Sequence, residues 1–125
     1  MKAIHTDKAP AAVGPYSQAI EAGGFVYVSG QLPLKDGKLV EEIKEATRQC
    51  LENLKAILEA AGTDLNHVVK TTVYLQDIGQ FADMNAVYAE YFNEHKPARA
   101  AFQVAKLPLG AIVEIEAVAH KCCNA

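Results

Sequence analysis

The sequence has no tryptophan and only three cysteines among its 125 residues. Cys50 stands alone, while Cys122 and Cys123 are adjacent, so the cysteines lack the spacing of a disulfide-stabilised domain. No stretch approaches the roughly 18 consecutive apolar residues of a membrane-spanning helix, and residues 1–16 lack the apolar segment of a signal peptide. We therefore expect a cytoplasmic protein, in a reducing compartment and without a membrane partner.

An excess of positive charge is missing as well. The 12 Lys and Arg residues and the 15 Asp and Glu residues give a net charge of −3, and the basic residues are scattered along the chain. Binding to a nucleic-acid backbone usually requires a basic patch or stripe. The composition therefore disfavours nucleic acid as a partner.

Motifs for metals and nucleotides are also lacking. The sequence contains no glycine-rich phosphate loop, no HExxH, no CxxC and no GxSxG. The four histidines do not have metal-ligand spacing, and although His120 lies near Cys122 and Cys123, neighbouring residues point apart. We interpret that end as a flexible tail and predict no metal and no nucleotide cofactor.

What the sequence does contain is the composition of one packed domain. Half of the residues are hydrophobic and 22% are charged, which is typical of a globular protein and not of a disordered one. No linker, repeat or low-complexity segment interrupts the chain, so we predict a single domain over residues 1–125.

The apolar pattern predicts a mixture of strands and helices. Apolar residues at steps of three and four mark helices at 42–61 and 80–94, and Gly62 follows the first as a stop signal. Runs rich in β-branched and aromatic residues mark strands, and Gly23-Gly24 and Asp36-Gly37 mark turns. The strands are expected at 2–4, 17–22, 25–32, 68–75, 99–105 and 112–120. The fold class that follows is α+β, with a mixed β-sheet and two helices packed on one face.

Two helices cover only one face of such a sheet. In the strand segments 25–28 and 72–75 both faces are apolar, so a monomer would leave a large apolar patch in water. We therefore predict a homo-oligomer that packs through the open sheet face.

Polar residues near the predicted strand ends are the candidates for chemistry. Gly-Pro-Tyr-Ser at 14–17 is a rigid turn that delivers a tyrosine and a serine, and Ser29-Gly30 is a small polar pair that lets backbone approach a ligand. Arg99 follows a proline-fixed turn, where a guanidinium can bind a carboxylate in a bidentate manner; the alternative is a surface salt bridge. Ser29 lacks a positioned base for nucleophilic catalysis, so we interpret its hydroxyl as closing the strand end.

Two glutamates, Glu114 and Glu116, share one face of a predicted strand, about 6.6 Å apart. That separation is similar to the carboxyl pair of inverting glycosidases, but both side chains point the same way instead of flanking a bond, and there is no tryptophan for sugar stacking. Each glutamate is either exposed at a sheet edge or buried beside a cation. Cys50, on the apolar face of the first helix, is interpreted as core and not as a nucleophile.

Seven segments taken together resemble the RidA (YjgF, reactive intermediate deaminase) family. They occur in the order typical of that family, cover nearly the whole chain and form a specific set. The segments are GPYSQA at 14–19, VSGQLP at 28–33, NLKAIL at 53–58, VKTTVYL at 69–75, FADMN at 81–85, PAR at 97–99 and VEIEA at 113–117.

The resemblance implies a chorismate-mutase-like fold and a homotrimer with active sites in clefts between subunits. It also implies hydrolytic deamination of reactive enamine and imine acids, such as 2-aminoacrylate and 2-aminocrotonate, to 2-oxo acids and ammonia. This is the reaction of a 2-iminobutanoate/2-iminopropanoate deaminase. Such substrates are released by pyridoxal-phosphate-dependent dehydratases, and their hydrolysis needs no cofactor.

The site residues of the family carry over position by position. By this resemblance Arg99 would bind the substrate carboxylate, Glu114 would orient or activate the attacking water, and Tyr16 would close the cleft. The residues that would line the cleft are Ser29, Gly30 and Asn85.

Ala101 departs from the family. Many members carry a cysteine at this position, so a thiol nucleophile is excluded here, although the Ala101 backbone can still contribute a hydrogen bond. An iminium carbon is already electrophilic, so holding the substrate carboxylate beside a water molecule suffices for hydrolysis. Burial would raise the pKa of Glu114 and Arg99 would lower it, which leaves the net direction open.

Two other functions stay open at this stage. One is an RNA-cleaving translation inhibitor, an activity also ascribed to members of the family, and the other is a non-enzymatic, chaperone-like trimer that captures small carboxylates. The net charge of −3 and the absence of a basic stripe speak against RNA cleavage.

Overall fold

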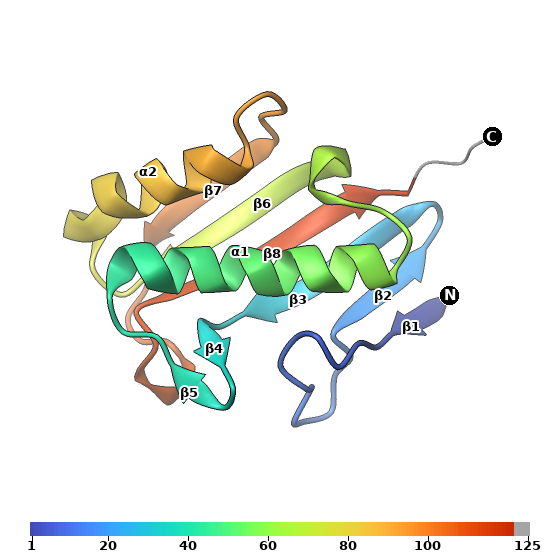
Figure 1. Ribbon diagram of the computed structural model, residues 1–125, viewed down its shortest axis with the longest axis horizontal. Coiled ribbons are helices and arrows are strands. Elements are labelled where there is room, and N and C mark those ends of the chain that lie inside the picture. The colour runs from blue at the N-terminus through green and yellow to red at the C-terminus, as the bar shows by residue number, and fades with distance from the viewer. Residues whose placement is uncertain (122–125) are drawn as a thin grey trace.

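Residues 1–121 are described by the computed structural model of the protein. Cys122 and Cys123, which we interpreted as part of a flexible tail, lie outside the described residues. Within 1–121 the chain forms a mixed sheet and two long helices (Figure 1), so the predicted α+β class is confirmed.

The sheet has six strands within the described residues. They are β1 (Lys2–Ile4), β2 (Ala19–Ala22), β3 (Phe25–Gln31), β6 (Val68–Leu75), β7 (Ala98–Gln103) and β8 (Val113–His120). Their spatial order is β1-β2-β3-β8-β6-β7, with β7 at one edge. Neighbouring strands are antiparallel except β6 and β7, which run parallel because a helical crossover connects them.

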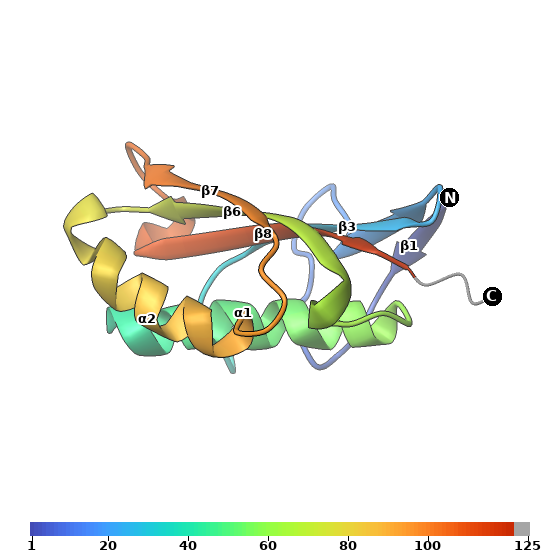
Figure 2. The ribbon, with the colours of Figure 1, turned by 90° about the horizontal axis from the view of Figure 1, so that it is seen from above.

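The helices are α1 (Ile43–Ala60) and α2 (Phe81–Tyr91), and Figure 2 shows both on one face of the sheet, as predicted. The Glu42 carboxylate begins α1 by accepting hydrogen bonds from backbone N–H groups of the first turn. Gly62 follows the end of α1 with a φ of +87°, a left-handed conformation that favours glycine. Neither helix is long and apolar enough to cross a bilayer, and this holds for the described residues as a whole.

The second helix is shorter than predicted. It ends at Tyr91 and not at Glu94, because Phe92 already leaves helical geometry with φ −119° and ψ 60°. Pro97, further along, disfavours helical backbone in the residue before it. A short loop therefore replaces the last predicted helical turn and leads into β7.

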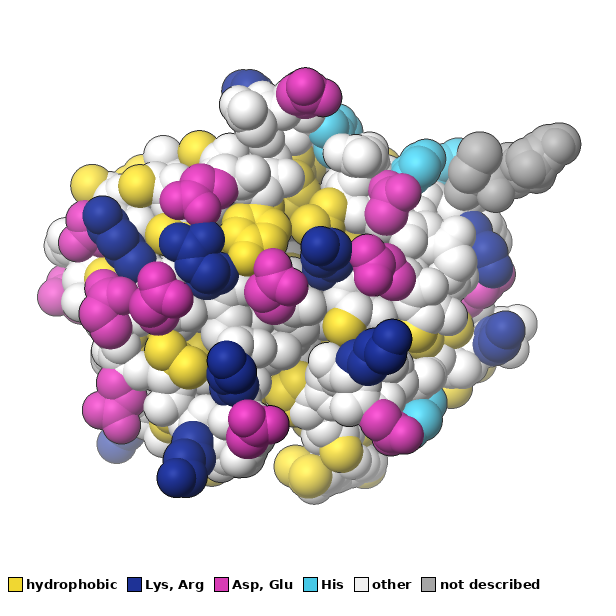
Figure 3. Space-filling model, viewed as in Figure 1, with side chains coloured by type: hydrophobic (Ala, Val, Ile, Leu, Met, Phe, Trp, Pro, Cys, Tyr) yellow, Lys and Arg dark blue, Asp and Glu magenta, His cyan; other side chains and the backbone are white. Residues whose placement is uncertain are grey.

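The outer surface of the helices carries charges of both signs. Figure 3, which shows the helix side of the molecule, has Lys and Arg side chains interspersed with Asp and Glu. Arg48 of α1 donates to Glu90 of α2 at 2.7 Å, and Tyr91 donates to Glu52 at 2.6 Å. These bonds join the two helices, and the described residues form no basic stripe on this face.

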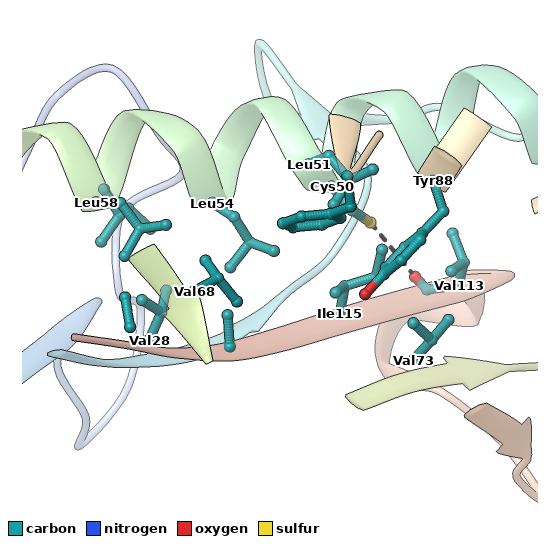
Figure 4. Packing of buried hydrophobic residues seen from close by; sticks show 14 of the residues in the cluster. Val28, Cys50, Leu51, Leu54, Leu58, Val68, Val73, Tyr88, Val113 and Ile115 are labelled. Carbon is teal, nitrogen blue, oxygen red and sulfur yellow. Dashed lines mark hydrogen bonds between the residues drawn. The ribbon is translucent and has the colours of Figure 1, made fainter. Parts of the chain in front are cut away.

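The core lies between α1 and the sheet (Figure 4). Leu54 of α1, Val68 of β6 and Ile115 of β8 are fully buried in one cluster. Cys50 belongs to the same cluster, where its thiol donates to the carbonyl of Val113 at 3.9 Å and burial raises its pKa. The interpretation of Cys50 as a core residue is confirmed.

A short hairpin adds two strands that the sequence did not predict. β4 (Leu34–Lys35) and β5 (Lys38–Leu39) pair with each other outside the main sheet. Their turn is the predicted Asp36-Gly37 pair, with φ values of +51° and +79°. Strands of two residues are too short to produce an alternating pattern, which is why the turn was recognised and the strands were not.

The sheet face opposite the helices, called the open face below, carries exposed aromatic rings. Tyr27 is 48% exposed and Phe102 is 45% exposed. Tyr74 packs against Phe102 edge-on, with ring centroids 5.4 Å apart. Exposed apolar side chains are thus present on the open face as predicted, whereas the oligomer that would cover them stays a prediction.

Candidate active site

A β-bulge in β3 lies at the centre of the candidate site. Between Val28 and Gln31 the register with β8 shifts, so that three steps along β3 oppose two along β8. The extra residue lies in the Ser29-Gly30 pair. Bulges bend a strand and redirect its groups, and they are frequent beside active sites. Here the bulge brings the backbone of β3 against the side chain of Glu114.

A side chain at position 30 would meet the carboxyl of Glu114. A Cβ atom there would lie 2.4 Å from Glu114 Oε2 and 2.9 Å from its Cδ. The Glu114 carboxyl therefore packs directly on the backbone of Gly30. The sequence predicted a glycine that allows close approach to a ligand, and in the single chain the group that approaches is this carboxyl.

Glu114 extends from the open face of the sheet. Its neighbours Val113 and Ile115 are fully buried beneath the helices, and successive side chains of a strand point to opposite faces. Partial burial, followed by the negative charge of Glu116, raises the pKa of Glu114 above its ordinary value. Arg99 does not contribute to this shift, so the direction that the sequence left open is upward within one chain.

Glu116 lies on the same face as Glu114, as predicted. The Tyr74 hydroxyl donates to Glu116 Oε1 at 2.9 Å, and burial together with this bond raises the pKa of Tyr74. Neither glutamate forms an ion pair within residues 1–121, and β8 is an interior strand. The two alternatives, exposure at a sheet edge and burial beside a cation, are therefore both wrong for the single chain.

A cavity of about 1000 Å³ opens beside Glu114. The other predicted site residues that line it are Tyr16, Ser29 and Gly30. Tyr16 is 53% exposed. The Ser29 hydroxyl donates to the carbonyl of Ser17 at 2.6 Å, which is the strand-closing role that the sequence indicated.

Gln18, which is not among the site residues predicted above, holds the loop that carries Tyr16. Its side chain is 3% exposed, accepts from the N–H of Thr6 at 2.8 Å and donates to the carbonyl of Pro10 at 2.8 Å. On another wall of the cavity, Asn53 of α1 donates to the backbone carbonyls of Leu32, just after β3, and of Leu34, the first residue of β4. Both residues lie in segments that carry the family resemblance, at 14–19 and 53–58, but no local pattern predicts their hydrogen bonds.

Arg99 lies in a second hollow, of about 390 Å³, on the edge strand β7. One guanidinium nitrogen donates to Asn85 Oδ1 at 2.6 Å. The guanidinium carbon also lies 4.7 Å from the centroid of the Tyr88 ring and 5.4 Å from that of Phe81. Within residues 1–121 Arg99 has no carboxylate partner, so the surface salt bridge considered above is not formed. The side chain is held in place and keeps donors for an anion.

Arg99 and Glu114 do not meet within one chain. Arg99 is level with Thr71 of β6, whereas Glu114 on the other side of β6 is level with Tyr74, which separates their backbones by about 14 Å. Arg99 also contacts α2, whereas Glu114 extends from the open face.

One chain therefore holds two separate groups of candidate site residues, called half-sites below. Ala101, next to Arg99 on the same face of β7, packs against the core. The arginine half-site consists of Asn85, Arg99 and Ala101. The acidic half-site consists of Tyr16, Ser29, Gly30 and Glu114.

The two half-sites have complementary chemistry. The Glu114 carboxyl, whose pKa is raised by burial and by the charge of Glu116, can accept and return a proton during a reaction. The Arg99 guanidinium can bind a carboxylate in a bidentate manner. In the described part of the chain, no three His, Cys, Asp or Glu side chains gather in a way that could hold a metal ion. The groups present suit proton transfer next to a bound carboxylate.

Residues 6–121 match the family model described as Endoribonuclease L-PSP. A RutC family protein of Pyrococcus horikoshii is 58% identical, over 94% of this chain and 96% of its own length. The mouse protein named 2-iminobutanoate/2-iminopropanoate deaminase is 53% identical, over 94% of this chain and 90% of its own. The crystal structure of RidA from an Antarctic Psychrobacter has a TM-score of 0.93 and 51% identity, and covers 96% of this chain and 99% of that one.

Proposed function

The chain belongs to the endoribonuclease L-PSP family, also called RidA/YjgF, and on that premise we propose that it hydrolyses reactive 2-imino acids to 2-oxo acids and ammonia. The proposed substrates are 2-iminobutanoate and 2-iminopropanoate, together with their enamine tautomers 2-aminocrotonate and 2-aminoacrylate. The name of the mouse relative supports this choice.

The observation that carries the proposal is the pair of complementary half-sites. A 2-imino acid presents a carboxylate directly beside the imine carbon. Arg99 has a fixed guanidinium with donors left for that carboxylate. Glu114 has a partly buried carboxyl beside a cavity, where it can act on the attacking water.

We place the complete site between two copies of the chain. The half-sites are about 14 Å apart in one chain and face different sides of the sheet, so one small molecule cannot touch both. In a closed homotrimer, the arginine half-site of each copy would face the acidic half-site of the next. The open face with Tyr27 and Phe102 is the surface that such packing would cover.

In the proposed reaction, Arg99 fixes the substrate carboxylate and so places the imine carbon near the Glu114 carboxylate. Water adds to that carbon while Glu114 accepts a proton from the water. The electron pair of the C=N bond moves to nitrogen, which takes the proton that Glu114 accepted from the water and forms an amino alcohol. Glu114 then accepts the hydroxyl proton and passes it to nitrogen as the C–N bond breaks, so that ammonia leaves and the hydroxyl becomes the oxo group.

This scheme needs no thiol. Ala101 stands where many family members have cysteine, so its contribution is limited to the backbone. We place the reaction in the cytoplasm, after pyridoxal-phosphate-dependent dehydratases, because these enzymes release enamines of the required structure. No cofactor takes part in the proposed steps.

The test couples the purified protein to a threonine dehydratase and follows the release of 2-oxobutanoate. We expect the protein to accelerate this release over spontaneous hydrolysis, and Arg99→Ala to abolish the acceleration. Arg48→Ala is the matched control, because Arg48 is an arginine on α1 whose partner is Glu90 and not a ligand. An Arg99→Ala protein that retains the full rate would contradict the proposal.

The two competing functions give different results in the same series. For an RNA-cleaving protein, RNA would be cut in a salt-dependent manner; the interspersed charges of the helix side make us expect no cleavage. For a non-enzymatic carboxylate-binding trimer, 2-oxobutanoate would raise the melting temperature of the wild type without any acceleration of imine hydrolysis.

A further inference from the structure

Leu109 occupies a backbone conformation that leucine rarely adopts. Its φ is +61° and its ψ is 11°, and Gly110 follows with φ +76°. The N–H of Ala111 donates to the carbonyl of Pro108 at 3.1 Å, which closes a four-residue turn with two successive positive φ values. This is the geometry of a type I′ turn, whose first central position favours asparagine or glycine. Local preference therefore does not explain a leucine here.

Burial does not explain the leucine either. Its side chain is 72% exposed, although the residues on either side of the turn, Leu107 and Ala111, are 6% and 2% exposed. The N–H of Gly110 also donates to the carbonyl of Leu107 at 3.3 Å. The turn is thus anchored at both ends and holds a strained, exposed leucine in a fixed position. Strain of this kind is found where the held side chain has a functional task.

The place of the turn indicates that task. Pro108 and Leu109 line the cavity that also contains Glu114, Ser29 and Gly30. The turn leads directly into β8, the strand that carries Glu114. An apolar side chain is therefore fixed in the same cavity as the carboxyl that would act on the imine carbon.

We propose that Leu109 is a specificity-determining residue whose side chain contacts the alkyl group of the 2-imino acid. The inference rests on the proposed function and deepens it. The preferred substrates would be 2-imino acids with an alkyl group of two or more carbons, because a longer alkyl group removes more apolar surface from water against the leucine.

The test compares two substrates in the same protein. A threonine dehydratase supplied with threonine or with serine generates the four-carbon and the three-carbon imino acid, and the ratio of the two kcat/KM values is measured. Leu109→Asn and Leu109→Gly both suit the turn. We expect each to lower the ratio of four-carbon to three-carbon kcat/KM by about fourfold, the value of one buried methylene, and to melt at the same or a higher temperature than the wild type.

The ratio of the two kcat/KM values reports substrate specificity alone. Misfolding or incomplete assembly removes active protein and lowers both values equally. Ile78→Asn is the matched control: Ile78 is 46% exposed and lies outside the cavity, and we expect its ratio to equal that of the wild type. An unchanged ratio in active Leu109→Asn and Leu109→Gly proteins would overturn the role of Leu109 alone. A wild type that accelerates neither substrate would instead contradict the proposed deaminase function, and this inference with it.

Discussion

At the scale of single residues, the contact between Gly30 and Glu114 fixes the acidic half-site. The backbone of the bulge leaves 2.4 Å between a hypothetical Cβ at position 30 and the carboxyl oxygen. The atoms that would clash belong to the end of a flexible side chain, so the fold can accommodate a methyl group while the carboxyl moves. A substitution at position 30 can therefore displace the Glu114 carboxyl without unfolding the protein.

Gly30→Ala tests this contact. We expect its melting temperature to stay close to that of the wild type, whereas kcat/KM for imine hydrolysis falls by about a hundredfold, because a displacement of about 1 Å is costly at a catalytic group. Glu114→Asp in the Gly30→Ala background shortens the clashing side chain and should recover part of the loss. Full activity in Gly30→Ala would show that Glu114 does not act from this position.

The raised pKa of Glu114 gives a prediction about stability. Burial and the charge of Glu116 favour the protonated carboxyl in the folded chain, so its contribution to stability is present below the unfolded pKa and is lost as the pH rises through the folded pKa. Glu114→Gln should therefore melt at a higher temperature than the wild type at pH 7, and the difference should shrink toward pH 4.

Scanning calorimetry between pH 4 and pH 8 measures this difference. Glu41→Gln, which changes an exposed carboxyl, serves as the control and should show no such trend. A Glu114→Gln protein that melts at a lower temperature than the wild type at pH 7 would mean that the Glu114 carboxylate stabilises the fold instead of destabilising it.

At the scale of elements, the sequence predicted the sheet and the helices well where the signal is local. The β-branched run at 68–75 has the bounds of β6, and α1 begins directly after its Glu42 cap. The end of α2 was predicted wrongly, because apolar spacing continues through Phe92 after the helical backbone has ended. The strands of the β4–β5 hairpin were not predicted, because each has only two residues.

The loop before β2 shows what local patterns cannot reveal. Gln18 bonds to Thr6 and Pro10 across the loop, and neither spacing nor composition predicts such bonds. Gln18→Ala should cost about 1–3 kcal/mol in the free energy of unfolding, because it leaves partly buried backbone groups without partners. It should also speed hydrogen exchange at the Thr6 amide. Urea denaturation and amide exchange measure the two effects.

Gln18→Glu separates the acceptor role of the Gln18 side chain from its donor role. A carboxylate can still accept from the Thr6 N–H but cannot donate to the carbonyl of Pro10, so we expect it to restore only part of the stability. The control is Gln103→Ala, because Gln103 is an exposed amide that accepts from a single backbone N–H. Equal stability of Gln18→Ala and the wild type would mean that the loop is held by other contacts.

At the scale of the whole molecule, the sequence could not predict how far apart the two half-sites lie. The resemblance suggested the roles of Arg99 and Glu114, but their separation depends on strand order and on the face from which each side chain extends. Both properties arise from pairing between distant segments: β6 lies between β7 and β8, although β8 follows β7 in the chain. Only the assembled sheet reveals that Arg99 and Glu114 lie too far apart in one copy to contact the same small molecule.

Mixing two inactive variants tests the shared site most directly. Co-expressed Arg99→Ala and Glu114→Gln chains, carrying different tags, are purified as mixed oligomers and assayed for imine hydrolysis. A site between copies would regain an intact Arg99 from one chain and an intact Glu114 from the next. In every mixed closed trimer one of the three sites would be complete, so we expect about a third of the wild-type rate. Mixed oligomers as inactive as either variant alone would contradict a site shared between copies.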